Sequence, residues 1–170
     1  MAQMNVIKDA ENKTLIFERV FPASRERVWA AWTNAEQIAK WWGPRGWTTA
    51  VKEFDFKPGG HLLYSMTCND PDQGDFYGQT HWAKSVYEVI DEANSFEYQD
   101  YFTDENGTAN EEMPTMTIHM EFTETPDGTK VSSKTIFPTQ EAYEQTVAMG
   151  VVEGVGQTWD RLEELLGKEA

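Results

Sequence analysis

Hydrophobic and polar residues alternate strictly over the stretch Thr115–Glu124. Successive side chains of a β-strand point to opposite faces, so this pattern predicts a strand with one buried and one solvated face. His119 falls among the polar positions, and we therefore expect it to face solvent and to take no part in chemistry. The predicted buried face consists of Met116, Ile118, Met120 and Phe122.

Further segments rich in branched and aromatic residues follow a polar leader over residues 1–13 and are separated by turn-forming residues. Short turns such as Lys57-Pro58-Gly59-Gly60 and Pro126-Asp127-Gly128 favour antiparallel pairing, because parallel strands need a longer connection. The sequence thus predicts about seven antiparallel strands. Besides Thr115–Glu124 they are Thr14–Phe21, Trp47–Phe56, Gly60–Cys68, Phe76–Ile90, Phe96–Phe102 and Thr129–Phe137.

Two short helices are predicted between the first and second of these strands. Ser24 is a candidate N-cap for the first helix, and Asn34, with Gln37 three residues later, resembles a capping box for the second. Gly43-Pro44 ends the second helix. The buried positions of both helices, at helical spacing, are Val28, Trp29, Trp32, Ile38, Trp41 and Trp42.

One long amphipathic helix is predicted from Thr139 to Leu166, with Thr139 as its N-cap and Gly167 near its end. Its apolar stripe needs a sheet to cover it. Three glycines, Gly150, Gly154 and Gly156, fall inside this helix, where each costs roughly 1 kcal/mol relative to alanine. Either the helix approaches the sheet closely at these positions, or the missing side chains leave space for a ligand.

Asp100 shares one face of its strand with Phe96, Tyr98 and Phe102 if that strand is regular. A carboxylate facing the core must be paired or hydrogen-bonded, or its pKa rises, as in binding sites and general acids. A bulge or a frayed strand end would instead turn Asp100 outward. The sequence leaves both orientations open.

Composition narrows the range of functions. The 29 acidic and 14 basic residues give a net charge of −15, which disfavours nucleic acid and anionic membrane surfaces as partners. The single cysteine, Cys68, forms no intramolecular disulfide, and neither a signal-peptide core nor a membrane-spanning run is present. We therefore expect a cytoplasmic protein.

Few residues suggest metal or enzyme chemistry. His61, His81, His119 and Cys68 form no close metal-binding motif, and no nucleophile elbow or phosphate-binding loop is present, so no cofactor is predicted. An enzyme would have to combine groups from separate strands, with His81, Asp100, Tyr64 and Tyr98 as candidates. Of His81 and Trp82, we expect the apolar Trp82 to face inward.

Several motifs resemble the AHSA1-like family, named after the activator of Hsp90 ATPase, in the START-like or SRPBCC superfamily. They are Phe21-Pro22-Ala23 before Val28-Trp29, Trp41-Trp42-Gly43-Pro44, Phe54 through Lys57-Pro58-Gly59-Gly60 followed by Met66, Met149-Gly150, Glu153-Gly154 and Asp160-Arg161-Leu162. The resemblance covers about residues 14–167, as a single domain. It implies an α+β helix-grip (START-like, Bet v 1-like) fold, with a curved antiparallel sheet around the long C-terminal helix.

Members of this superfamily bind lipids, hormones and polyketides, and some are cyclases or hydrolases. The resemblance therefore implies a small apolar ligand between sheet and helix, with a cyclase, dehydratase or hydrolase as the alternative. An Hsp90 co-chaperone ranks third, because the protein that names the family has an additional N-terminal domain. The expected cavity residues are Tyr64, Met66, Trp82, Tyr98, Asp100, Met116, Ile118, Met120, Tyr143, Val147 and Val151.

Overall fold

A computed structural model of the chain describes residues 4–168 and contains one eight-stranded antiparallel sheet. The strand order is β1-β2-β8-β7-β6-β5-β4-β3, so the first long strand pairs with the last one. The strands are β1 (Asn5–Asp9), β2 (Thr14–Phe21), β3 (Trp47–Phe54), β4 (His61–Cys68), β5 (Thr80–Asp91), β6 (Ser95–Thr103), β7 (Met116–Thr125) and β8 (Gly128–Ile136).

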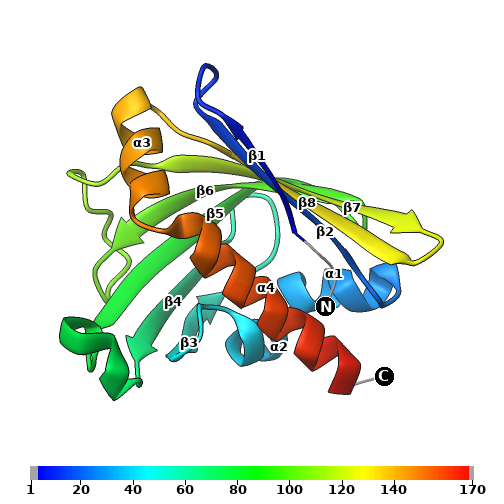
Figure 1. Ribbon diagram of the computed structural model, residues 1–170, viewed down its shortest axis with the longest axis horizontal. Coiled ribbons are helices and arrows are strands. Elements are labelled where there is room, and N and C mark those ends of the chain that lie inside the picture. The colour runs from blue at the N-terminus through cyan, green and yellow to red at the C-terminus, as the bar shows by residue number, and fades with distance from the viewer. Residues whose placement is uncertain (1–3, 169–170) are drawn as a thin grey trace.

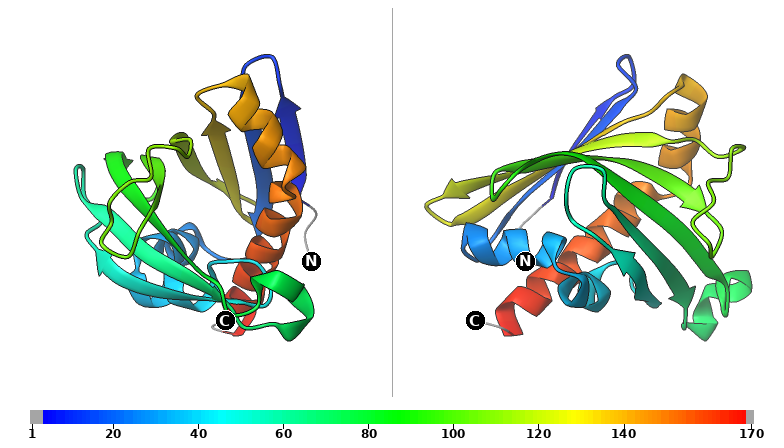
Figure 2. Two further views of the ribbon diagram at one scale, coloured as in Figure 1. Left: turned by 90° about the vertical axis from the view of Figure 1, so that its left-hand side faces the viewer. Right: turned by 180° about the vertical axis from the view of Figure 1, so that it is seen from behind.

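Helices lie on one side of this curved sheet (Figure 1). The short helices α1 (Arg25–Thr33) and α2 (Ala35–Trp41) cover one end, and α3 (Gln140–Ala148) and α4 (Val151–Lys168) run across the concave face. A 3-10 helix, η1 (Pro71–Phe76), connects β4 to β5. Figure 2 (left) shows α3 and α4 on one side and β4–β6 on the other. This arrangement is the predicted α+β helix-grip fold.

The sheet has one strand more than predicted. Asn5–Asp9, within the polar leader, pairs with β2 and forms the edge of the sheet. This strand buries little of its surface, so its sequence carries no clear alternation of apolar and polar residues. Its backbone hydrogen bonds to β2 hold it, and these do not depend on side-chain type.

Side-chain caps start the helices where the sequence places them. The Ser24 side chain accepts a hydrogen bond from the Arg27 backbone N–H, and Asn34 accepts from Glu36 and Gln37. Thr139 accepts from the Ala142 N–H at the start of α3. The three predicted N-caps are thus confirmed.

The prediction of one unbroken C-terminal helix is wrong. Its residues form α3 and α4, separated at Met149-Gly150. Gly150 has a φ of +87°, a left-handed conformation that glycine adopts without steric cost. Gly150 therefore ends α3 and is not inside a helix.

The predicted strand Phe76–Ile90 also begins later than expected. It starts at Thr80, because η1 occupies the residues up to Phe76.

The alternation predicted for β7 is confirmed. Met116, Ile118, Met120 and Phe122 are buried, whereas His119 faces outward and lies 3.0 Å from the Glu121 carboxylate.

Aromatic side chains fill the space beneath α1 and α2. Trp32 makes edge contacts with Phe21, Trp41 and Trp159, with ring centroids 6.1, 4.7 and 6.0 Å apart. Trp41 is fully buried, and its indole N–H donates to the Ala31 carbonyl at 3.0 Å. Trp41 thus belongs to the core.

Within residues 4–168, no helix is both long and apolar enough to cross a bilayer.

The two glycines on either side of the start of α4 are expected to respond oppositely to alanine. Gly150→Ala should lower the free energy of unfolding by about 1 kcal/mol, because alanine is strained at positive φ. Gly154→Ala should raise it by about 0.5–1 kcal/mol, because Gly154 is helical and a Cβ there meets no atom within 4 Å. Urea denaturation of both variants measures this, and a loss of stability in Gly154→Ala would contradict the open space.

Candidate functional site

Side chains on the concave face of the sheet become more exposed to solvent from one end of the strands to the other. On β6, Phe96 and Tyr98 are 2% and 6% exposed, Asp100 is half-buried, and Phe102 is 39% exposed. All four occupy alternate positions and therefore share one face. The neighbouring strand β4 repeats the trend, since Tyr64 is buried and Met66 only half-buried.

Helix α4, which covers the concave face, also changes from buried to half-buried along its length. Its fully buried residues, Trp159, Leu162 and Leu166, all lie from its midpoint onward. Val155 and Val151, one and two turns before Trp159 on the same stripe, remain half-buried. The first half of the helix therefore lies over the sheet without fully closing on it.

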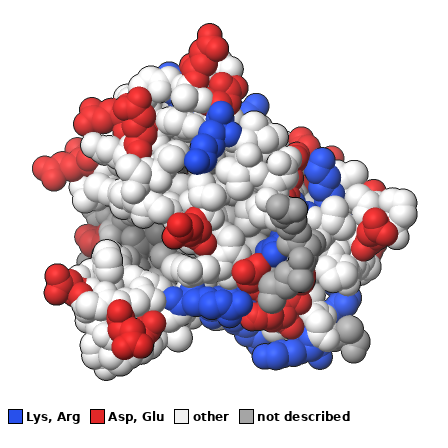
Figure 3. All heavy atoms as spheres, in the orientation of Figure 1, with Lys and Arg blue, Asp and Glu red and all other residues white. Residues whose placement is uncertain are grey.

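We call this region the open end of the concave face. It comprises Met66, Asp100 and Phe102 on the strands and Val147, Val151 and Val155 on the helices. In the orientation of Figure 3, the surface is hollowed on its left side, near the lobe formed by η1.

The glycines of α4 contradict one of their two interpretations. A Cβ built on Gly154 or Gly156 meets no atom within 4 Å. The idea that these glycines permit close contact between helix and sheet is therefore wrong. Open space lies beside the helix at both positions.

Ten of the eleven predicted cavity residues belong to this concave face and its helical cover. Cross-strand partners face the same side of a sheet, and the register pairs Tyr98 with Ile118 and Asp100 with Met116. Residues of the set that join one core cluster or pack against it are Tyr64, Met66, Tyr98, Met116, Ile118, Met120, Tyr143, Val147 and Val151. Asp100 lies on the same face, because it is the cross-strand partner of Met116.

Trp82 is the exception, and its predicted inward orientation is wrong. Its strand partners, Ser65 and Thr103, lie on the opposite face from Tyr64 and Phe102, and Lys52 Nζ lies 5.6 Å from its ring centroid. His81, the neighbouring residue, instead contacts the ring of Trp47 at 5.5 Å. The apolar character of Trp82 gave a wrong prediction, because the concave face is exposed to solvent at this position and does not require an apolar side chain there.

Asp100 points to the concave side, which decides between the two orientations left open by the sequence. It pairs with the buried Ser85 on β5, whose hydroxyl donates to Asp100 Oδ1 at a long 3.4 Å. Burial among apolar and aromatic groups raises the pKa of the Asp100 carboxyl from 3.8 to about 7, and the Ser85 hydrogen bond opposes this only partly. Asp100 can therefore change its charge near neutral pH.

Three tyrosines, one on each of β4, β5 and β6, lie near this carboxyl. Burial, and then the negative charge of Asp100, raise the pKa values of Tyr64, Tyr87 and Tyr98 above their ordinary range. Their hydroxyls therefore stay protonated and can donate hydrogen bonds. Ser85 and Tyr87 escaped the sequence reasoning, although their alternate positions on β5 could have placed them opposite Asp100 and Tyr98.

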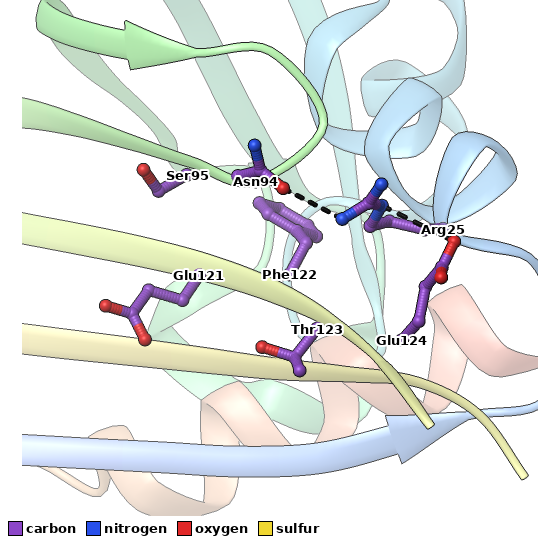
Figure 4. A pocket seen from close by; sticks show the side chains of 7 residues that line it. All are labelled: Arg25, Asn94, Ser95, Glu121, Phe122, Thr123 and Glu124. Atoms are coloured by element: carbon purple, nitrogen blue, oxygen red, sulfur yellow. Dashed lines mark hydrogen bonds and ion pairs between the residues drawn. The ribbon is translucent and has the colours of Figure 1, made fainter. Parts of the chain in front are cut away.

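Two surface recesses lie elsewhere, and both are occupied by structural contacts. In the first, of about 270 Å³, Arg25 Nη1 donates to Asn94 Oδ1 at 2.8 Å, and Arg25 Nε lies 3.7 Å from a Glu124 oxygen (Figure 4). These contacts join α1 to the β5–β6 turn and to β7.

The second recess, of about 400 Å³, lies between α4 and the loop before β3. There Arg161 Nη1 donates to the carbonyls of Gly43 at 2.7 Å and Trp47 at 3.1 Å. Arg161 thus fixes the loop. Over the described part of the chain, no three His, Cys, Asp or Glu side chains are grouped to hold a metal ion.

Comparisons with known proteins agree with this fold. The family model for activator of Hsp90 ATPase homolog 1-like protein matches residues 22–167. The crystal structure of the Mycobacterium smegmatis protein Ms6760 is 30% identical, with a TM-score of 0.85 over 98% of this chain and 97% of that one. A Staphylococcus epidermidis protein solved by NMR is 29% identical, with a TM-score of 0.83 over 98% and 96% of the two chains. No protein with a curated description matches.

Asp100 is expected to make stability depend on pH. Because its pKa is raised on folding, the folded state binds more protons than the unfolded state between pH 3.8 and about 7. This contribution therefore weakens the fold as pH rises through that window, by at most about 4 kcal/mol. Asp100→Asn should gain stability over the wild type at pH 8 but not at pH 4.

Urea denaturation at both pH values, with Glu97→Gln on the same strand as control, measures this difference. Carboxyl NMR titration of Asp100 reads its pKa directly. An Asp100 carboxyl that titrates near pH 4 would contradict the structure.

Proposed function

We propose that this chain, which belongs to the activator of Hsp90 ATPase homolog 1-like family, binds an apolar or amphipathic small molecule at the open end of the concave face. The observation that carries this proposal is the gradient of burial shared by β4, β6 and α4. The two strands and the helix each leave apolar side chains only half-covered toward one of their ends. A ligand bound between the strands and α4 would bury these half-exposed apolar side chains.

The energetic argument concerns apolar area. Each Å² removed from water is worth roughly 25 cal/mol, so leaving Phe102, Val151 and Val155 partly hydrated forgoes stability. Exposed apolar groups on a concave surface are typical of ligand sites. Binding would recover this free energy.

The lining suits ligands of more than one shape. Met66 and Met116 contribute flexible thioethers on the concave face, and methionine adapts to irregular neighbours better than branched side chains do. The open space beside Gly154 adds room on the helical side. We therefore expect a tolerant site with modest specificity for the apolar part of its ligand.

A hydrolase, cyclase or dehydratase at the same place is a second candidate, and Asp100 favours it. A half-buried carboxyl whose pKa is raised to about 7 is suited to proton transfer near neutral pH. The neighbouring tyrosine hydroxyls, held protonated, can donate to a developing negative charge. Mass spectrometry of a captured ligand before and after incubation would reveal turnover, and loss of that turnover in Asp100→Asn would assign it to this carboxyl.

Filling the open end should weaken binding. Val155→Trp places a large ring between α4 and the sheet, and we expect it to weaken binding of the fluorescent probe Nile red by at least about tenfold. Glu153→Trp adds the same ring on the exposed outer side of the helix and should leave binding unchanged. Fluorescence titration gives both dissociation constants, and circular dichroism checks that each variant is folded.

Native mass spectrometry of the freshly purified wild type tests for a retained ligand as added mass. If the wild type shows neither a retained ligand nor saturable Nile red binding, the proposal is wrong. Equal weakening in Glu153→Trp would attribute the effect to the helix and not to the site.

A further inference from the structure

Asp100 carries an acidic group into a surface whose other side chains are mostly apolar and aromatic, with Ser85 and His81 as polar members of the same face. Among the described residues, its one hydrogen bond is the 3.4 Å contact from the Ser85 hydroxyl, and no ion pair involves it. Two carboxylate oxygens can accept about four hydrogen bonds, so most of this capacity is unused within the described chain. A side chain that is only half-buried also remains open to a ligand.

The cations that face the concave side are engaged elsewhere. Arg19 Nη2 lies 2.6 Å from Asp160 Oδ1, and Arg161 donates to loop carbonyls. Burial raises the pKa of the Asp100 carboxyl and the Ser85 hydroxyl lowers it, and no positive charge of the described residues contributes to this pKa. The counter-charge for this carboxylate is therefore not supplied by the described part of the chain.

Aromatic rings flank the same carboxyl. Tyr87 and Tyr98 lie with ring centroids 6.1 Å apart, and Tyr64 packs edge-on against Trp42 at 6.0 Å. The faces of such rings attract cations, and a carboxylate among aromatic rings is a chemistry suited to an ammonium group. A protein with a net charge of −15 also concentrates cations near its surface.

We propose that the ligand is an amphipathic amine, whose ammonium group pairs with the Asp100 carboxylate among Tyr64, Tyr87 and Tyr98. Its apolar part then lies along Met66, Val151 and Val155 at the open end. This inference rests on the proposed function, because it names the chemical class of the molecule bound there. An amine would supply the counter-charge that Asp100 lacks among the described residues.

Three probes with the same ten-carbon chain separate the head group from the tail. Decylamine and decanoate, each below its micelle-forming concentration, and decanol, below its solubility limit, compete with Nile red for the wild type, Asp100→Asn and Glu97→Gln. Glu97 is a matched control, because it is an acid on β6 that points to the opposite face. For the wild type and Glu97→Gln we expect decylamine to bind on the order of tenfold more tightly than decanol, and decanoate to bind most weakly.

In Asp100→Asn the preference for decylamine should fall to near one, with decanol unaffected. Equal binding of decylamine and decanol to the wild type would overturn this inference and leave the proposed function standing. An amine preference that persists in Asp100→Asn would also overturn it. Failure of all three probes and of Nile red would reject both. Should Asp100→Asn not fold, Asp100→Ser replaces it, and the wild-type preference decides independently of either variant.

Discussion

The packing of Trp159 determines where the C-terminal helix lies, and the rest of the concave side depends on it. This ring contacts Phe17, Phe21 and Trp32, with centroids 6.4, 5.7 and 6.0 Å away, and thereby joins α4 to β2 and α1. Arg19 adds a polar constraint through its 2.6 Å contact with Asp160, one residue further along the helix. Both contacts lie at the middle of α4, so the helix is fixed from there onward and its first two turns are not drawn onto the sheet.

The buried arginine explains the rotation of the helix better than its stability. Removing the Arg19 charge from water costs several kcal/mol, which the pair with the partly exposed Asp160 and the nearby Glu163 offsets. An aliphatic side chain could fill this position at lower cost, but it would accept several rotations of α4. Arg19 accepts one, with Asp160 and Glu163 turned toward β2. Val151 and Val155 are thereby directed over the sheet.

Local rules predicted the elements that local interactions create. Thr139 caps a helix and Met116 alternates with Thr117 because both patterns involve residues close in sequence. The strand β1 escaped prediction, since backbone pairing with a distant strand creates it. Gly150 was misjudged for a related reason: its helical neighbours on both sides fit one apolar stripe, and only the left-handed φ reveals the break.

The candidate site was harder to predict because its defining property is incomplete burial. Polarity indicates whether a side chain is expected inside, but at the open end the concave face holds Asp100 and His81 while Trp82 points away. Their orientation follows from the register of β5 with β4 and β6, in which a bulge between Tyr87 and Val89 shifts the alternation. Separating the packed end from the open end also separates stability from binding. The aromatic cluster around Trp159 can hold the fold while the other end of the same face remains incompletely packed, as a site for an exchangeable ligand requires.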